Sequence, residues 1–310
     1  MPQPLALPDD ALVFALAAAA AFAGLDLSQK WTARYAVSAP EPFLALRFVG
    51  GAALSPLLLL LPGTAAPRFD AAALSTLAAL IAVNLLGNIL YLRGVYRADI
   101  SVVGSLWPLK NFYLPLFAFA TTGERFAPNV YALLAAAMLG AVGIAYNSKL
   151  RWQALRESPV AVMVLVTVPV FAVSDMLFGA ASQGGVGARW TTVLMAWGVA
   201  SLGLPLLLRR KETRTDVAEA LRSKRGCLGA TLTGTFLVIG VYCIGEAFAR
   251  ARGVVLVNVF AMLSGLFLLA VNAVLPGRLD AQEGGTTYAV RFAGALVLVG
   301  AASALLNTAW

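Results

Sequence analysis

The stretch ISVVGSLWPLKNFYLPLFAFA, residues 100–120, decides the class of this protein. It is apolar almost throughout, and it is long enough to cross the hydrocarbon core of a bilayer, which takes about 20 residues of helix. In its middle stands Lys110, beside Asn111 and two residues after Pro108. The stretch therefore predicts a membrane-spanning helix that carries an ammonium group far from bulk water.

The rest of the chain repeats this apolar character. The 310 residues are 60% hydrophobic and 12% charged, whereas a typical soluble domain is about 25% charged. Lipid cannot satisfy backbone hydrogen-bonding groups, and the alternating pattern of barrel strands is absent, so such stretches must be helices. The sequence predicts an all-α membrane fold with ten transmembrane helices, at approximately 11–37, 42–62, 71–92, 99–121, 128–147, 159–182, 190–208, 226–249, 254–276 and 286–309.

The charged residues lie mostly between these segments. Asp9 and Asp10 precede the first segment, where a secretory signal would carry basic residues, so we expect the segment to remain as the first helix. The net charge is +8. Binding to nucleic acid would need a basic face on a soluble domain, and the sequence has none, so we do not expect nucleic acid as a partner. The densest basic run, residues 209–225, is expected to be a solvated connection that meets anionic lipid headgroups.

A weak internal repeat divides the chain. FAGLD, which ends at Asp26, returns as FAVSD, which ends at Asp175. Further along, LGAVG around Gly140 returns as AGALV around Gly294, and both glycines are expected to permit close helix packing. An odd number of helices in each copy turns the second copy upside down, as in many secondary transporters. The sequence predicts two inverted five-helix repeats, residues 1–150 and 151–310.

Several of these features together carry a family resemblance. The segment 98–147 has a small-residue start, a central proline, a Gly-Glu turn and a glycine-bearing helix, and PEPFLALRF at 40–48 opens the second helix with Arg47 in it. The chain thus resembles the EamA-type branch of the drug/metabolite transporter (DMT) superfamily. The second copy departs from the pattern, because Arg278 stands where the first copy has Glu124, and Ala196 is the equivalent of Arg47.

The resemblance implies a fold and a function. It implies a ten-helix secondary transporter or exporter of small organic solutes, a multi-pass protein of the plasma (inner) membrane. It also implies a central cavity lined mainly by the first, third, fourth, sixth, eighth and ninth helices. Most loop Lys and Arg residues lie on the side opposite the termini, which favours termini outside, whereas the resemblance favours termini inside. The orientation is therefore open.

Lys110 is the residue most in need of explanation. A charge near the bilayer centre costs at least about 2.5–3.5 kcal/mol on insertion scales, so it must be paired, hydrated or functional. Trp107 and Asn111 supply an aromatic wall and an amide close to it. Two interpretations are open. The ammonium group binds the carboxylate or phosphate of an anionic solute, or it forms a structural ion pair with Asp26 or Asp175.

The two repeat-related carboxylates are the next candidates for solute binding or coupling. Asp26 shares a helix face with Lys30 at i, i+4 spacing, which predicts partial neutralisation. Asp175 has no basic residue nearby on its own helix, so burial would favour its neutral form. Because the chain has no histidine, Asp175 is the better candidate for a coupled proton, with a purely structural role as the alternative. The remaining candidates are Asn88, Tyr91 and Asn258. Polar side chains within membrane helices more often bond between helices than bind a solute, but the resemblance implies that the helices of Asn88 and Asn258 surround the cavity.

No catalytic or cofactor motif accompanies these residues. The sequence has no Walker-type phosphate loop, no dinucleotide-binding glycine run and no zinc-spaced cluster. We therefore expect no enzyme activity, cofactor or metal, and a small-molecule substrate and the lipid bilayer as partners. The favoured hypothesis is alternating-access transport of metabolites such as amino acids or organic anions, coupled to a proton or counter-solute. The alternatives are multidrug or organic-cation efflux, a membrane-embedded enzyme and a scaffold.

Overall fold

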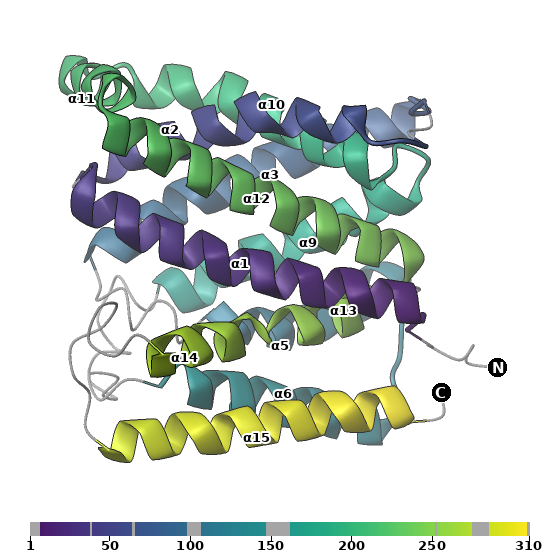
Figure 1. Ribbon diagram of the computed structural model, residues 1–310. Helices are drawn as coiled ribbons and strands as arrows, with labels where there is room; N and C mark the ends of the chain where they lie inside the picture. The colour runs from purple at the N-terminus through teal and green to yellow at the C-terminus, as the bar shows by residue number, and fades with distance from the viewer. Residues whose placement is uncertain are drawn as a thin grey trace.

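The protein is an all-α, multi-pass membrane protein. The computed structural model describes residues 7–37, 39–63, 66–97, 107–146, 162–251, 253–274 and 285–308, and within these ranges the chain forms helices and no strands. Eight of the helices are long and apolar enough to cross a membrane. They run side by side in one bundle (Figure 1), as expected where lipid leaves backbone groups no partner outside the helix itself.

The helices and their irregular turns follow one another along the whole described chain. Three short segments are not α-helical: two are 3-10 segments, η1 and η2, and one is a π-helical turn, η3. In chain order the elements are α1 (Asp9–Tyr35), α2 (Pro40–Leu54), η1 (Ser55–Leu60), α3 (Ala71–Arg97), η2 (Trp107–Leu109), α5 (Lys110–Thr122), α6 (Pro128–Ile144), η3 (Met163–Thr167), α9 (Val168–Gln183), α10 (Ala188–Leu207), α11 (Lys211–Arg222), α12 (Lys224–Arg250), α13 (Val254–Ala261), α14 (Ser264–Val274) and α15 (Gly285–Asn307).

Eight of the ten predicted segments coincide with the spanning helices. The predicted segment 99–121 lies partly outside the described residues and is seen from Trp107 onward as η2 and α5. The predicted segment 128–147 corresponds to α6, an apolar helix of 17 residues. The predicted segment 254–276 is interrupted after α13, because the backbone tightens into a turn at Met262 and Leu263 before α14 begins.

The basic run 209–225 differs from the expectation of a simple connection. It contains the helix α11, which packs against α2 and α12. Thr213, Val217 and Ala220 are buried, and their i, i+4, i+7 spacing places them on one helix face. The stretch is therefore an amphipathic helix whose narrow apolar face is covered by the bundle.

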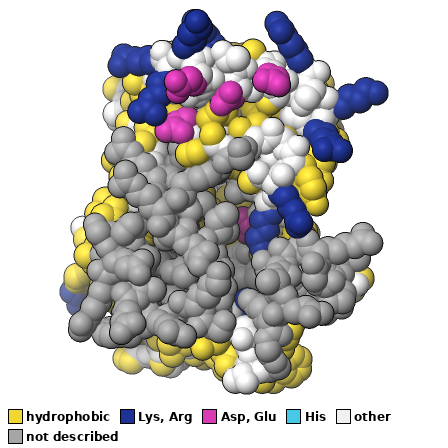
Figure 2. All heavy atoms as spheres, turned by 90° about the vertical axis from the view of Figure 1, so that its left-hand side faces the viewer, with side chains coloured by type: hydrophobic (Ala, Val, Ile, Leu, Met, Phe, Trp, Pro, Cys, Tyr) yellow, Lys and Arg dark blue, Asp and Glu magenta, His cyan; other side chains and the backbone are white. Residues whose placement is uncertain are grey.

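Basic side chains gather at one end of the bundle (Figure 2). α1 begins and α15 ends at the same end, which we call the termini end, and α11 lies at the opposite one, the α11 end (Figure 1). Figure 2 views the α11 end, where Lys and Arg side chains gather along one edge and further basic side chains lie lower on the same face. Both cysteines are free, with Cys227 exposed and Cys243 buried.

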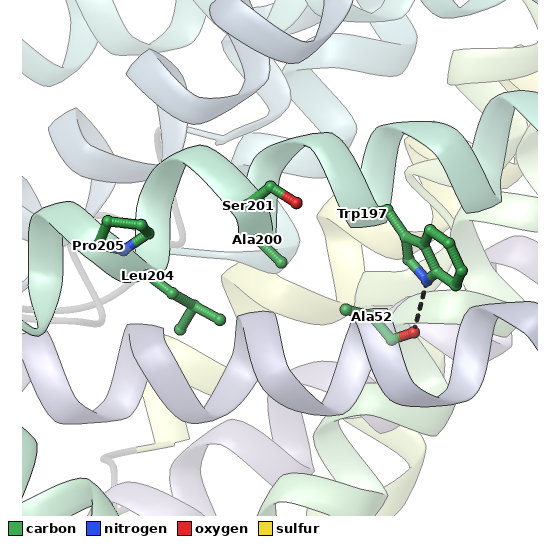
Figure 3. Close-up of a pocket in the computed structure, with 6 residues that line it drawn as sticks. All are labelled: Ala52, Trp197, Ala200, Ser201, Leu204 and Pro205. Carbon is green, nitrogen blue, oxygen red and sulfur yellow. Dashed lines mark hydrogen bonds between the residues drawn. The ribbon is translucent and has the colours of Figure 1, made fainter.

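Pro56 shows how the bundle accommodates a missing amide. In α2 the carbonyl of Ala52 would accept from the N–H four residues on, but proline has none, and the helix continues as η1. The indole Nε1 of Trp197 on α10 donates to the Ala52 carbonyl instead, at 2.9 Å (Figure 3). A pocket of about 400 Å³ lies beside this contact between the two helices. The hydrogen bond therefore fixes α2 against α10 where the α-helix ends.

Pro169 is accommodated in the same way. The π-helical turn η3 has i→i+5 bonds, such as Val168 N–H to the Met163 carbonyl. The next carbonyl, that of Val164, would therefore meet Pro169, which has no N–H to donate. The hydroxyl of Tyr113 on α5 donates to the Val164 carbonyl at 3.1 Å. A side chain from a neighbouring helix again satisfies a carbonyl that a proline has left free.

The helices α6 and α15 approach each other at two glycines. A Cβ placed on Gly294 would lie 2.6 Å from the carbonyl oxygen of Gly140, and one placed on Gly140 would lie 2.5 Å from the amide nitrogen of Leu298. Both clashes are with backbone atoms, which cannot rotate away as a side chain does. The expectation that Gly140 and Gly294 permit close helix packing is confirmed.

Alanine at Gly294 should therefore destabilise the bundle. We expect Gly294→Ala to lower the free energy of unfolding by about 1–3 kcal/mol, the usual cost of overpacking. Gly300→Ala is the matched control, because Gly300 lies on the same helix and a Cβ there meets nothing within 4 Å. That variant should be neutral or up to about 1 kcal/mol more stable. Thermal unfolding of the two purified variants in detergent measures the difference, and equal losses would contradict the packing argument.

Candidate functional site

A cavity of about 1340 Å³ lies in the bundle. On α1 its lining residues fall between Phe22 and Tyr35, in the half of the helix nearer the α11 end, and Arg225 at the start of α12 also lines it. The helices expected to line a cavity, α1, α3, α5, α9, α12 and α13, all contribute, and other helices add to them. All eight residues singled out from the sequence line it: Asp26, Asn88, Tyr91, Trp107, Lys110, Asn111, Asp175 and Asn258.

An ion pair joins two walls of the cavity. The Nζ atom of Lys110 on α5 lies 2.6 Å from Oδ2 of Asp175 on α9, and the two side chains are only 14% and 21% exposed. Of the partners considered for Lys110, this conformation has Asp175 and not Asp26. Asp175 has no basic residue nearby on its own helix, as expected, and its basic partner comes from another helix. Asp175 is therefore neutralised by Lys110.

An aromatic cluster lies one helical turn from the ion pair. The rings of Trp107 and Phe171 have centroids 4.8 Å apart, and Tyr91 on α3 meets them edge to face at 5.5 and 6.5 Å. We call Tyr91, Trp107 and Phe171 the aromatic triad. Gly87 makes room for it, since a Cβ there would lie 3.0 Å from Cζ of Phe171. The sequence pointed to Tyr91 and Trp107 but missed Phe171, although Phe171 opens the repeated FAVSD motif.

A chain of polar groups connects α3 with α9 beside the ion pair. The Asn88 Nδ2 donates to the backbone carbonyl and to Oδ1 of Asn84, both at 2.8 Å. The Asn84 Nδ2 in turn donates to the hydroxyl of Ser174 at 3.2 Å. Asn84 therefore makes the bond between helices, and Asn88 orients it from one turn along α3. This arrangement fixes the α9 backbone next to Asp175.

Three amide oxygens at the cavity wall are buried without a hydrogen-bond partner among the described residues. They are the Oδ1 atoms of Asn88, Asn111 and Asn258, which come from α3, α5 and α13. Asn258 uses its Nδ2 to donate to the Val254 carbonyl at 3.0 Å, which leaves the oxygen unused. A buried acceptor without a donor costs about 1–3 kcal/mol, so water or a bound solute is expected to supply the donor.

Asp26 and Arg47 face the cavity from α1 and α2. Asp26 is exposed although it lies in the body of α1, because its carboxylate points into the cavity. Lys30 and Arg47 both act on it electrostatically, the first as expected from the sequence. The Nε atom of Arg47 is buried without a partner among the described residues. The sequence showed this arginine inside an apolar segment but assigned it no role in the site.

The cavity is closed toward the termini end by contacts among buried aromatic side chains. The rings of Phe178 on α9 and Phe248 on α12 meet edge to face with centroids 6.4 Å apart. Gln183 then bridges the ends of both helices, because its Nε2 donates to the carbonyls of Phe248 at 2.8 Å and Ala251 at 3.2 Å. The polar bridge and the aromatic contact together hold α9 against α12 at this end.

Arg250 adds a second connection at the termini end. Its Nε lies 2.9 Å from the Asp10 carboxylate on α1, its Nη1 pairs with Glu246 one turn earlier, and its guanidinium lies 4.4 Å from the centre of the Phe14 ring. Arg250 thus joins Glu246 on its own helix to Asp10 on α1. We call Asp10, Glu246, Arg250 and Phe14 the arginine clasp, and it ties α1 to α12.

The comparisons with known proteins bear on the fold. No protein-family model matches the sequence, and no curated protein matches it. Chains of known structure do match, 27 in number. One of these structures, described as "Crystal structure of protein", has a TM-score of 0.70 to this chain, with 95% of this chain and 98% of that one covered and 17% sequence identity. At this identity the likeness concerns the fold alone.

The ion pair between Lys110 and Asp175 can be measured by a double-mutant cycle. Removing one partner leaves the other charge without its counter-ion, so we expect Lys110→Met and Asp175→Asn each to destabilise the protein more than the double variant does. The coupling energy should fall at about 0.5–3 kcal/mol, typical of groups in contact. Thermal unfolding in detergent provides the measurement.

The control cycle uses Glu41 and Arg210, which lie 3.6 Å apart with side chains 37% and 75% exposed. An exposed pair of this kind contributes about 0–1 kcal/mol. A coupling for Lys110 and Asp175 no larger than that of the control would show that the pair is not formed in solution.

Proposed function

We propose that this chain is a secondary active transporter that moves a small organic metabolite across the plasma membrane by alternating access. The observation that carries the proposal is the charged and aromatic cavity inside an all-α membrane bundle. A buried ion pair is often no better for stability than well-packed apolar residues of the same volume. Charges that line a large cavity within a membrane protein are therefore best explained by a solute that enters it.

The helix contacts support the proposal that ten helices form two inverted repeats. Under the proposed repeat, α1 is equivalent to α9 and α3 to α12. α1 packs on α12 and α9 packs on α3, so the same contact occurs twice. α2 packs on α10, and α6 on α15, so these helices meet their own equivalents. Gly140 and Gly294, aligned by the repeat, touch each other, as residues near a twofold axis do. The proposed repeats are residues 1–150 and 151–310.

Interrupted helices support the same arrangement. α5 begins at Lys110 after the 3-10 turn η2, and α14 begins at Ser264 after the turn at Met262 and Leu263. The two starting points differ by 154 residues, as do Gly140 and Gly294. Turns that are not α-helical, at corresponding positions of the two halves, are expected if both halves are copies of one unit, as in many secondary transporters. The arrangement also agrees with the resemblance to the DMT superfamily, of which we propose the chain is a member.

The transport cycle would use the ion pair as an exchangeable contact. In the described conformation Asp175 pairs with Lys110. The anionic group of an arriving solute competes with Asp175 for the ammonium group, and the released carboxylate is then free to take up a proton. Binding of solute and protonation of Asp175 would thereby be coupled, which is one way for a gradient to drive transport.

The described conformation has its cavity reaching the α11 end, with aromatic contacts and the arginine clasp closing the termini end. Alternating access requires a second conformation in which these contacts separate and the α11 end closes. The clasp is then one of the contacts that break and form during each cycle.

A screen followed by a flux measurement tests the transport function. Purified protein is first tested by thermal shift against amino acids, organic acids, sugar phosphates and nucleobases, and the best stabiliser is then used in counterflow assays with reconstituted vesicles. We expect Lys110→Ala to abolish flux of an anionic solute while eluting as a folded protein on size exclusion. Arg210→Ala, at the α11 surface, is the matched control and should transport normally.

Each outcome of the screen has a defined meaning. Stabilisation by organic cations alone would favour multidrug or organic-cation efflux in place of metabolite transport. Normal flux in the Lys110→Ala variant would contradict the role given to this lysine. No stabilisation and no flux with any compound class would overturn the transporter proposal in favour of a membrane enzyme or scaffold.

Loss of the arginine clasp should open the termini end. Removing about 1 kcal/mol from the closed state raises the open population about fivefold, so Arg250→Ala should speed maleimide labelling of a cysteine placed at Ala15, which is fully buried on α1. The labelling rate is measured with Cys227 and Cys243 replaced by serine. Arg210→Ala serves as the control and should leave the rate unchanged, and an unchanged rate in Arg250→Ala would show that the clasp does not hold this end closed.

A further inference from the structure

The charge of the cavity lining is strongly unbalanced. Six basic side chains line it, against two acidic ones: Lys30, Arg34, Arg47, Lys110, Arg225 and Arg291 against Asp26 and Asp175. Both carboxylates already lie beside bases, since Asp175 pairs with Lys110 and Asp26 interacts with Lys30 and Arg47. A cavity with surplus positive charge and low-dielectric walls concentrates anions and repels cations.

Arg47 is the base best placed to bind an anion. It comes from the apolar helix α2 and lines the cavity, and its buried Nε has no acceptor among the described residues. Arg250 and Arg210 differ from it, because Arg250 is paired with Asp10 and Glu246 and Arg210 with Glu41. A guanidinium group offers five N–H donors in a planar fork that matches a carboxylate or phosphate. Its open donor is therefore suited to an oxyanion.

The aromatic triad lines the same cavity as this arginine. Tyr91 contacts both Trp107 and Phe171, so the three rings form one surface. The guanidinium group and this ring surface therefore both face the space that a solute would occupy. Aromatic pairs prefer offset or edge-to-face contacts, and the triad, already arranged edge to face, offers such contacts to a further ring.

We propose that the solute is an aromatic organic anion, with Arg47 binding its carboxylate or related oxyanion alongside Lys110 and its ring packed on Tyr91, Trp107 and Phe171. This inference rests on the proposed transport function and specifies the chemical class of its solute. An organic cation would meet the surplus of positive charge, and an aliphatic anion would leave the triad unused. The unpartnered oxygens of Asn111 and Asn258 are then available to hydroxyl or amine substituents on the ring.

Binding of matched probes to the purified protein tests the inference independently of flux. The anionic probe is 4-hydroxybenzoate, its neutral counterpart is 4-hydroxybenzyl alcohol, the cation is phenethylamine and the non-aromatic anion is cyclohexanecarboxylate. We expect 4-hydroxybenzoate to bind at least about tenfold more tightly than each of the other three, as one charge-assisted hydrogen-bonded contact allows. Isothermal titration in detergent gives the affinities.

Variants at the two parts of the site separate binding from folding. Arg47→Gln should weaken 4-hydroxybenzoate about tenfold and leave 4-hydroxybenzyl alcohol unchanged, so that the preference for the anion disappears. Arg47→Lys should recover part of this preference, because it keeps the charge and loses the planar fork. Phe171→Leu should lower the preference for 4-hydroxybenzoate over cyclohexanecarboxylate. Arg210→Gln is the surface control and should bind all four probes as the unaltered protein does.

The results distinguish failure of this inference from failure of the transport function. Tighter binding of phenethylamine, or an Arg47→Gln variant that keeps its preference for the anion, would overturn the inference even if solute flux is measured. Equal loss of all four probes in Arg47→Gln would likewise overturn it, because the arginine would then be structural. Probe binding as expected without flux of any solute would uphold the inference and contradict the transporter proposal.

Discussion

Inside a bilayer, a polar group that has no partner in the protein finds none in the lipid, and this constraint explains much of the bundle. Where Pro56 and Pro169 remove a backbone donor, Trp197 and Tyr113 from neighbouring helices donate to carbonyls of the affected turns. The ammonium group of Lys110 is held by a carboxylate on another helix. Buried acceptors without a partner do occur at the cavity wall, where water or a solute is able to reach them.

The same constraint decides how much the sequence could reveal about the site. A charge or amide deep in an apolar segment must point away from lipid, so a rule that uses one helix at a time was enough to select eight residues that line one cavity. The pairing of Lys110 with Asp175 was left open, because it depends on how α5 and α9 pack. The basic partner of Asp175 could not be found from its own helix for that reason. Phe171 and Gly87 were missed because the ring of Phe171 packs against Gly87 on another helix, and this contact exists only in the folded bundle.

The helix boundaries show a second limit of the sequence. Apolar length predicted where the chain crosses the membrane, but α13 and α14 read as one uninterrupted segment, because the turn between them contains only apolar side chains, Met262 and Leu263. The basic run containing α11 was taken for a connection because most of its residues are charged or polar. Only three residues of the helix, on one face, are buried. Arg47 was visible within its helix, yet its open donor appears only once the neighbouring helices are in place.

The arginine clasp also has a consequence for the surroundings of the protein. Arg250 and Asp10 keep 33% and 60% of their side chains exposed, so mobile ions reach this pair. Salt at physiological concentration screens exposed charges over about 8 Å. The contact that holds one end of the bundle shut is therefore weakened by dissolved electrolyte on that side of the membrane, which makes the balance between the two ends dependent on the medium that each one faces.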